Sequence, residues 1–287
     1  MLAAVVPGVM LSLALPAARA NDREAALPSP PPNLTGVVIE RAPDPSEAAS
    51  ADESASRVLL LSGDGGWTDV EESLSAEFVD YGLTVIGVDS RRTFVSDHAR
   101  EEIAHYLEHL TGSGQGLIIV GYAFGADLLP IVWPALSRNL RDSTVRVAMI
   151  SPTHDGSLRI DPTGRYDAAF GPTIPLQQTV QHVPRSRLVC IFGMQERLSG
   201  YSSCTNPQFD PAERVELPGG HDLGRNYADV AGAIAKPLRL KRHRTAGGPP
   251  RHLPPPAARS VPTARSTPPT PLRARAPAHP VPRSVSS

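Results

Sequence analysis

The chain has 287 residues, of which 40% are hydrophobic and 5% aromatic, and its formal net charge is −1. This length allows one large domain or two small ones, with a core that is mainly aliphatic. Eleven Lys and Arg residues, and no Asp or Glu, lie from Lys236 onward. Subtracting these eleven positive charges from the total leaves a net charge of −12 for the part of the chain before Lys236. We therefore expect no nucleic-acid partner for the folded domain.

Residues 1–20 have the pattern of a secretory signal peptide. Val5–Leu15 is an apolar stretch of the usual length, and the small-x-small sequence A-R-A ends at Ala20. No Lys or Arg precedes the apolar stretch, which indicates either a start further upstream or a weak signal. The stretch is short for an uncleaved membrane anchor, the alternative interpretation. We therefore expect export to the periplasm, with cleavage near Ala20.

Composition divides the rest of the chain into three parts. Residues 21–56, rich in Pro, Ala, Ser and acidic residues, are predicted to form a linker, interrupted by a candidate edge strand at Thr35–Glu40. Residues 57–237 have the alternating pattern of a folded domain. Residues 238–287 are rich in Pro, Arg, Ala, Ser and Thr without periodicity, which predicts a disordered tail. Such a tail either binds acidic lipid or nucleic acid or, more simply, is a solvated extension.

Strands and helices alternate along the predicted domain. The predicted elements, in chain order, are a strand at Val58–Leu61, a helix at Val70–Tyr81, a strand at Thr84–Val88, a helix at Ala99–Leu110, a strand at Gly116–Val120, a helix at Ala126–Leu136, strands at Val145–Ile150, Leu188–Phe192 and Val215–Leu217, and a helix at Tyr227–Leu238. This order predicts an α/β fold, with a doubly wound, mostly parallel sheet covered by helices on both faces.

The sequence Gly121–Gly125, G-Y-A-F-G, lies between a predicted strand and a predicted helix. In the G-x-S-x-G elbow of α/β hydrolases, the serine occupies a strained strand-to-helix turn that the two glycines make sterically accessible. Here the central residue is Ala123, whose methyl group has no nucleophilic or acid–base chemistry. The pattern predicts an α/β-hydrolase-type sheet in which alanine occupies the nucleophile position.

A glycine-rich loop follows the first strong strand, at the sheet edge where open α/β sheets bind ligands. Its residues Asp64, Gly65 and Gly66 are candidates for an oxyanion or substrate site, together with Tyr122 and Phe124 of the elbow. Backbone N–H groups in such loops bind a developing negative charge on a carbonyl oxygen. A tight turn, with Asp64 capping the next helix, is the alternative interpretation.

His221 follows the last predicted strand, where a triad in the order nucleophile, acid, histidine has its base. The best placed acid is Glu196, after the strand Leu188–Phe192, with Asp210 and Asp222 as alternatives. A structural histidine and a surface glutamate are the simpler interpretations. No cofactor and no metal ion is predicted.

Two cysteines, Cys190 and Cys204, are present. In an exported chain an even number of cysteines favours a disulfide, and the serine- and glycine-containing loop between them can reverse direction. The alternative is a buried Cys190 on its strand and an unrelated Cys204.

With these motifs in place, the chain resembles the VirJ/AcvB family of bacterial periplasmic virulence-associated proteins from about Arg57 to Ala235. The matching stretches are Leu61–Trp67, Gly87–Ser90, Gly121–Asp127, Ser151–Thr153 and Leu217–His221. Together, S-G-D-G-G-W and G-Y-x-F-G-A-D are specific strings. The resemblance implies an α/β-hydrolase fold, and family members look like serine hydrolases that act on aminoacyl-phosphatidylglycerol. Some are linked to type IV secretion.

The resemblance also assigns roles to individual residues. It implies serine where Ala123 stands, His221 as the general base and Glu196 as the acid. The pair Cys190 and Cys204 also fits the family pattern, whereas the long tail is not a family feature. We expect a catalytically impaired relative that binds a phospholipid or small ester at the cell envelope. Two alternatives stay open: an active aminoacyl-phospholipid esterase, if Ala123 is an altered serine, and a type IV secretion accessory protein that binds secretion-system or envelope proteins.

Overall fold

The computed structural model describes residues 34, 37–43, 57–112, 116–161 and 173–242, and the backbone of residues 259–260. The predicted signal peptide, most of the predicted linker and most of the predicted tail lie outside the described residues. None of the helices within these ranges combines the length and the apolar composition needed to cross a membrane.

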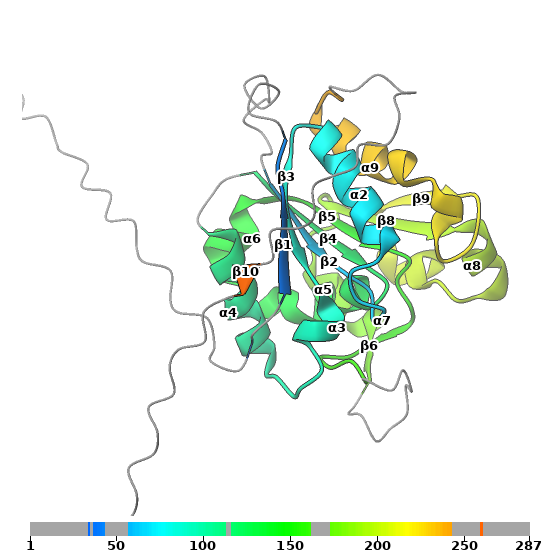
Figure 1. The fold of residues 1–287 in the computed structure, drawn as a ribbon. Helices are drawn as coiled ribbons and strands as arrows, with labels where there is room; N and C mark the ends of the chain where they lie inside the picture. Colours follow the sequence, from blue (N-terminus) through cyan, green and yellow to red (C-terminus); the bar gives the residue numbers. More distant parts are fainter. Residues whose placement is uncertain are drawn as a thin grey trace, which may run out of the picture.

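A mostly parallel sheet of eight strands forms the centre of the molecule, with helices on both faces (Figure 1). In their order across the sheet, the strands are β10 (Arg259–Ser260), β1 (Val37–Arg41), β3 (Thr84–Val88), β2 (Arg57–Leu61), β4 (Leu117–Tyr122), β5 (Thr144–Ile150), β8 (Leu188–Gly193) and β9 (Glu213–Leu217). The strands from β3 to β9 run parallel, and β1 is antiparallel to β3. The predicted doubly wound sheet is confirmed.

The candidate edge strand corresponds to β1. It pairs with β3 on one side, and on the other side only its first two residues pair with the two-residue strand β10. A separate antiparallel pair, β6 (Asp155–Gly156) and β7 (Ile174–Pro175), forms a second, very short sheet. The predicted tail therefore contributes one short pairing to the main sheet.

Four of the helices match the predicted ones closely. The helical segments are α2 (Asp69–Asp80), α3 (Ser90–Thr93), α4 (Arg100–Thr111), α5 (Phe124–Val132), α6 (Arg138–Ser143), α7 (Leu176–Thr179), α8 (Met194–Ser199) and α9 (Tyr227–Ala235), with 3-10 turns η1 (Trp133–Ala135), η3 (Val180–His182), η4 (Ser203–Thr205), η5 (Pro207–Phe209), η6 (Leu223–Arg225) and η7 (Lys236–Leu238). The helices predicted at Ala126–Leu136 and Tyr227–Leu238 end in the 3-10 turns η1 and η7. Each turn has a proline near its start, where a missing N–H is tolerated.

Two apolar clusters, one on each face of the sheet, form the core. Along β2, Leu59 and Leu61 belong to the cluster that includes residues of α4 and α5, whereas Val58 and Leu60 belong to the cluster that includes residues of α2 and α9. Successive side chains of a strand point to opposite faces, so a strand covered on both sides has a continuous apolar sequence. This is why the run at Val58–Leu61 predicted a buried parallel strand.

The strand order also locates the site. The chain passes from β2 to β3 on one side and then returns to place β4 on the other side of β2. In such sheets ligands bind in the crevice at the carboxyl ends of the strands where this change of direction occurs. The loops that follow β2 and β4 are the glycine-rich loop and the elbow, so both predicted motifs lie at this crevice.

Candidate active site

The strand-to-helix turn between β4 and α5 has the strained geometry of a nucleophile elbow. Ala123 lies at its apex with φ 49° and ψ −115°, a region that non-glycine residues rarely occupy. Its N–H donates to the carbonyl of Ile150 at 2.9 Å, and its carbonyl accepts from Asp127 N–H at 3.0 Å. The backbone is therefore held in the elbow conformation by β5 and by the first turn of α5.

The two flanking glycines are required by close backbone contacts. A Cβ at Gly121 would lie 2.3 Å from the carbonyl oxygen of Gly125, and a Cβ at Gly125 would lie 2.4 Å from that of Leu61. Neither contact can be relieved by moving a flexible side chain, because both partners are backbone. The G-x-A-x-G spacing thus has a steric cause that is independent of the central residue.

The glycine-rich loop approaches the elbow closely. A Cβ at Gly63 would lie 3.4 Å from the Cβ of Ala123, so the two backbones are in near contact. The buried carboxylate of Glu71 shapes this loop, accepting from Gly63 N–H at 3.2 Å, Thr68 N–H at 2.8 Å and Thr68 Oγ1 at 2.6 Å. Thr68 caps α2, so the interpretation of Asp64 as its cap was wrong. No sequence motif had indicated this role for Glu71.

Backbone N–H groups at this junction differ in their availability. Gly66 N–H donates to the carbonyl of Gly63 at 3.1 Å within the loop turn. Phe124 is the first residue of α5, where N–H groups have no acceptor within the helix, and its ring packs in the core against Phe94. Of the predicted oxyanion residues, Phe124 therefore offers only its N–H, and the Gly66 N–H is already used within the loop, whereas the Gly65 N–H has no acceptor among the described residues.

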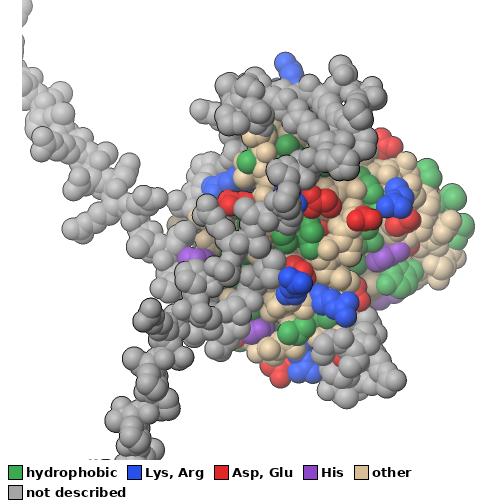
Figure 2. Space-filling view, in the orientation of Figure 1, with side chains coloured by type: hydrophobic (Ala, Val, Ile, Leu, Met, Phe, Trp, Pro, Cys, Tyr) green, Lys and Arg blue, Asp and Glu red, His purple; other side chains and the backbone are tan. Residues whose placement is uncertain are grey.

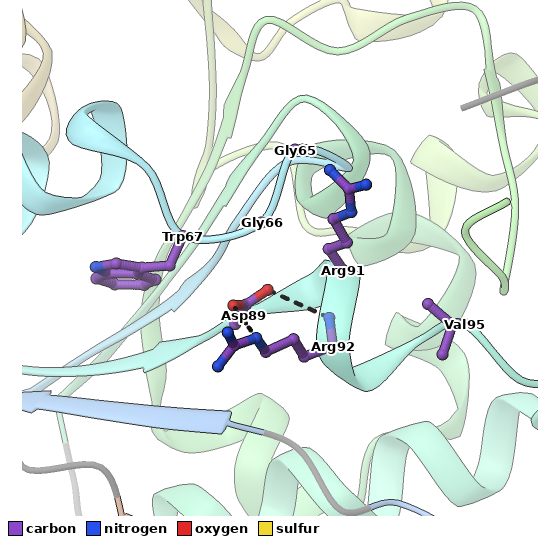
Figure 3. Close-up of a pocket in the computed structure, with 7 residues that line it drawn as sticks. All are labelled: Gly65, Gly66, Trp67, Asp89, Arg91, Arg92 and Val95. Carbon is purple, nitrogen blue, oxygen red and sulfur yellow. Dashed lines mark hydrogen bonds and ion pairs between the residues drawn. The ribbon is translucent and has the colours of Figure 1, made fainter. Parts of the chain in front are cut away.

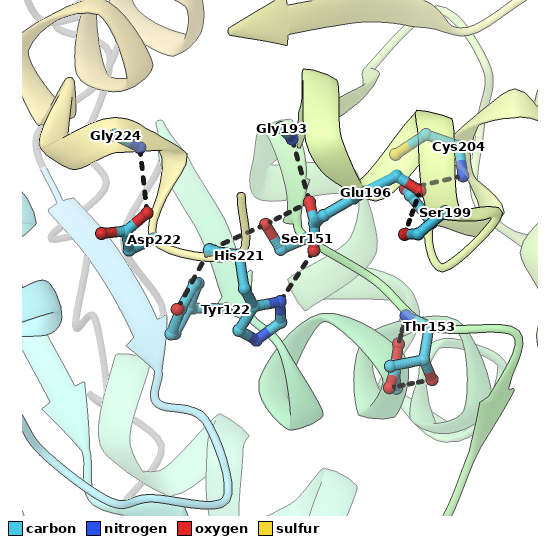
Figure 4. A network of polar contacts seen from close by, with 12 residues as sticks. Tyr122, Ser151, Thr153, Gly193, Glu196, Ser199, Cys204, His221, Asp222 and Gly224 are labelled. Atoms are coloured by element: carbon cyan, nitrogen blue, oxygen red, sulfur yellow. Dashed lines mark hydrogen bonds and ion pairs between the residues drawn. The ribbon is translucent and has the colours of Figure 1, made fainter. Parts of the chain in front are cut away.

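His221 and Glu196 come together although they are 25 positions apart in the sequence (Figure 4). Nδ1 of His221 lies 2.7 Å from Oε1 of Glu196. The glutamate side chain is 4% exposed, whereas the histidine side chain is 42% exposed, so the imidazole is accessible and its partner is not. This is the relation of an orienting acid to a general base.

The other carboxylate oxygen of Glu196 is bound as well. Oε2 accepts from the Gly193 N–H and from Ser151 Oγ, each at 2.9 Å. Burial would raise the pKa of Glu196, but these hydrogen bonds and the contact with His221 outweigh it and lower the pKa below its usual value. Glu196 is therefore held as an ionised carboxylate. Ser151 lies directly after β5 and contacts the candidate acid, a position that no sequence motif had indicated.

Two tyrosines enclose the imidazole of His221. The ring of Tyr122 lies 5.2 Å from it, and the ring of Tyr201 meets it edge-on at 5.6 Å. The hydroxyl of Tyr122 donates to the His221 carbonyl at 3.2 Å, which fixes the histidine loop to β4. Burial raises the pKa of Tyr122, so this phenol remains a neutral donor.

A second buried carboxyl group, Asp127, lies one turn into α5. It accepts from Thr153 N–H at 2.8 Å, and its Oδ2 lies 2.7 Å from Thr153 Oγ1. The same hydroxyl also lies 2.8 Å from the carbonyl of Asp155. A hydroxyl has one proton to donate, so Thr153 Oγ1 shares it between these two acceptors. Burial raises the pKa of Asp127 by more than the hydrogen bonds from Thr153 lower it.

The remaining candidates lie apart from the His–Glu pair. Asp210 forms an ion pair with Arg214 at 2.8 Å, and Asp222 accepts from Gly224 N–H at 3.1 Å. Neither is a partner of the imidazole, so the geometry favours Glu196 among the three carboxylates. Ser62 is buried and accepts from Ser90 N–H at 2.9 Å through its Oγ, so it does not replace the missing hydroxyl.

The predicted disulfide is confirmed. Cys190 on β8 and Cys204 in η4 are joined, with their Cα atoms 5.6 Å apart. The segment that the bond closes includes α8 and thus Glu196. Within the described ranges, no cluster of three or more His, Cys, Asp or Glu residues is arranged to hold a metal ion.

Several solved structures share this fold at low sequence identity. A lipase-esterase related protein from Clostridium acetobutylicum is 14% identical, with 69% of this chain and 98% of that chain covered and a TM-score of 0.51. Proline iminopeptidase from Mycobacterium smegmatis is 12% identical over 70% and 93% of the two chains, with a TM-score of 0.50. MenH from S. aureus is 8% identical over 71% and 99%, also with a TM-score of 0.50. At these identities the likeness shows the α/β-hydrolase fold alone.

Among curated proteins, no relative matches this sequence. The family described as bacterial virulence protein (VirJ) matches residues 56–242, which is more than half of the chain. This match includes the glycine-rich loop, the elbow, Glu196 and His221, and it confirms the resemblance found from the sequence motifs. The chain belongs to the VirJ family of bacterial virulence proteins.

Proposed function

We propose that this protein is a catalytically impaired VirJ-family hydrolase that retains a ligand-binding role at the cell envelope. The observation that supports the proposal is the presence of Ala123 at the apex of an otherwise complete elbow. The strained backbone at that position costs on the order of 1–3 kcal/mol and is typical of functional sites. The accompanying His221–Glu196 pair and the N–H donors are the other parts of a hydrolase site.

The chemistry of such a site defines what is missing. In ester hydrolysis by this fold, a serine hydroxyl attacks the carbonyl, a histidine takes its proton, and N–H donors stabilise the oxyanion. Loss of the serine costs about 10⁶-fold in kcat, while the oxyanion hole and substrate binding can leave about 10³–10⁴ over the reaction in water. Binding of an ester can therefore outlast efficient turnover.

The ligand proposed is an aminoacyl-phosphatidylglycerol or a similar small ester. A second candidate, residual hydrolysis of the same ester, is favoured by one observation: Nε2 of the accessible His221 has no hydrogen-bond partner among the described residues. That nitrogen can take a proton from a water molecule, which would then replace the serine as the nucleophile.

The test compares the protein with its Ala123→Ser variant. We expect turnover near the uncatalysed rate for the protein and at least about 10³-fold faster release of the amino acid by Ala123→Ser. The double variant Ala123→Ser/His221→Ala is the control and should lose this gain. Equal and substantial turnover by the protein and Ala123→Ser would contradict the impairment, and no turnover by Ala123→Ser would contradict the assignment of the ester site.

The periplasm is the proposed location. The Cys190–Cys204 bond supports it, because disulfides persist in oxidising compartments, and so does the signal pattern at residues 1–20. We expect N-terminal sequencing of the protein recovered from a periplasmic fraction to begin at Asn21. Recovery of the unprocessed chain from the cytoplasm, with both cysteines reduced, would contradict export.

A further inference from the structure

A pocket of about 440 Å³ lies beside the glycine-rich loop, at the carboxyl ends of β2 and β3 (Figure 3). Its lining residues are Gly65, Gly66, Trp67, Asp89, Arg91, Arg92 and Val95. Apart from the Gly65 N–H, none of these groups has a part in the ester chemistry considered above. The pocket is nevertheless close to the elbow, because Gly63 of the same loop nearly touches Ala123.

Trp67 forms a wall of this pocket that the rest of the fold holds in place. Its indole lies directly over Gly87 of β3, where a Cβ would come within 2.2 Å of the ring. The indole Nε1 donates to Glu72 at 2.9 Å, and Glu72 in turn accepts from the buried Arg41 at 2.7 Å. Because these contacts are all made by Gly87, Glu72 and Arg41 of the fold itself, the wall is preorganised and binding need not order it.

The charge of the pocket is positive. Arg91 has no ion-pair or hydrogen-bond partner among the described residues, and Figure 3 shows its side chain directed toward Gly65. Arg92 lies 3.7 Å from Asp89, whose other carboxylate oxygen accepts from the Arg92 N–H at 3.2 Å. Two arginines and one carboxylate leave a formal charge of +1. Figure 2 shows Lys and Arg side chains gathered over the area of α3 on this face.

We propose that this pocket binds the phosphate group of a ligand, with Arg91 as its main contact. A guanidinium binds a phosphate through two parallel hydrogen bonds, and an unpaired one loses no existing partner in doing so. The Gly65 N–H is a further donor, and the face of Trp67 packs against the apolar or glycerol part next to the phosphate. Identification of a phospholipid head group as the source rests on the proposed function, whereas phosphate binding itself does not.

The experiment measures binding by calorimetry and tryptophan fluorescence on the complete chain, which needs no turnover. The probes are inorganic phosphate and glycerophosphoglycerol, a soluble phosphodiester head group. Trp67 lines the pocket, whereas the only other tryptophan, Trp133, is 3% exposed in the core, so a fluorescence change reports on the pocket. Arg91→Gln should weaken binding roughly tenfold, since it removes a charge-assisted contact.

Two further variants make the test specific. Asp89→Asn removes the negative charge of the pocket but keeps an acceptor for the Arg92 N–H, so binding should tighten about threefold. Arg138→Gln is the matched control. Its side chain is 88% exposed and belongs to α6, which directly precedes β5 and thus lies at the amino ends of the strands, opposite the pocket, so binding should not change.

The outcomes separate the site from the proposed function. Tighter binding of glycerophosphoglycerol would identify a lipid head group as the source, and tighter binding of inorganic phosphate would identify a free phosphate; both support the site if Arg91→Gln weakens them. Equal affinities of the protein and Arg91→Gln, or no binding of either probe, would overturn it. Arg91-dependent binding together with an inactive Ala123→Ser variant would leave the site standing and reject the proposed ester substrate.

Discussion

At the scale of single residues, two buried carboxyl groups beside the elbow have opposite pKa shifts. Glu196 accepts hydrogen bonds from Gly193 and Ser151 and contacts His221, so its pKa is lowered although burial opposes this. Among the described residues, Asp127 has side-chain hydrogen bonds with Thr153 alone, and it has acidic neighbours, so burial dominates and its pKa is raised. The difference follows from the number of donors that each group receives, not from depth alone.

Replacement of Asp127 by asparagine should abolish the loss in free energy of unfolding that this group causes as pH rises. A folded-state pKa above the unfolded value, about 3.9, means that the folded form binds more protons, so unfolding becomes easier as pH rises. The loss is roughly 1.4 kcal/mol per pH unit while only the unfolded form is ionised. Urea unfolding between pH 4 and 8 should show Asp127→Asn gaining stability relative to the protein as pH rises.

Glu196→Gln is the matched comparison for that series. Its carboxyl group has a lowered folded-state pKa, so the stability it contributes is present above the ordinary carboxyl range and is lost as pH falls. The protein and Glu196→Gln should therefore converge in stability toward low pH.

The prediction for Asp127 has its own contrary outcome. Parallel pH profiles for the protein and Asp127→Asn would show that Asp127 is ionised in the folded state.

At the scale of elements, the disulfide connects β8, the strand next to the edge strand β9, to the turn η4. It closes a loop with a sequence separation of 14 that includes α8 and Glu196. The short elements in this region were not predicted, because α8 has only six residues and so too few positions for an apolar period to show. The long helices α2 and α4 were predicted closely for the opposite reason.

Removal of this cross-link should destabilise the fold measurably. Loop-closure entropy for a loop of about 15 residues corresponds to about 3 kcal/mol. We expect Cys190→Ala/Cys204→Ala to lose about this free energy of unfolding in urea, and a reducing agent to have the same effect on the protein but none on the double variant. A loss below about 1 kcal/mol would show that packing around β8 holds α8 without the bond.

At the scale of the whole molecule, the packed unit is larger than the family match. The match begins at residue 56, yet β1 adds an antiparallel strand to β3 before that point, and Arg41 at its end is bound to Glu72 of α2. At the other end, Arg242 forms ion pairs with Glu77 and with Asp80 of the same helix. Both ends of the domain are thus anchored on α2.

A chain shortened by residues 1–43 should fold less stably. It would lose the pairing of β1 with β3 and the burial of Leu34 and Ile39, which are 1% and 3% exposed. Burial of two aliphatic side chains contributes about 3–6 kcal/mol. Thermal unfolding should show a clearly lower Tm than for the complete chain, and an unchanged Tm would show that β1 is dispensable.

The elements and motifs of this protein follow from local sequence, whereas the contacts within the site do not. Apolar period and turn chemistry act over a few residues, so they were enough to predict β2, β3, the elbow around Ala123 and the acid and histidine positions. Three features depend on segments that meet only when the sheet assembles. They are the pairing of Glu196 with His221, the burial of Asp127 and the absence of a partner for Arg91 among the described residues. Hydrogen bonding, desolvation and charge at a site are sums over such distant neighbours, and they exist only in the folded chain.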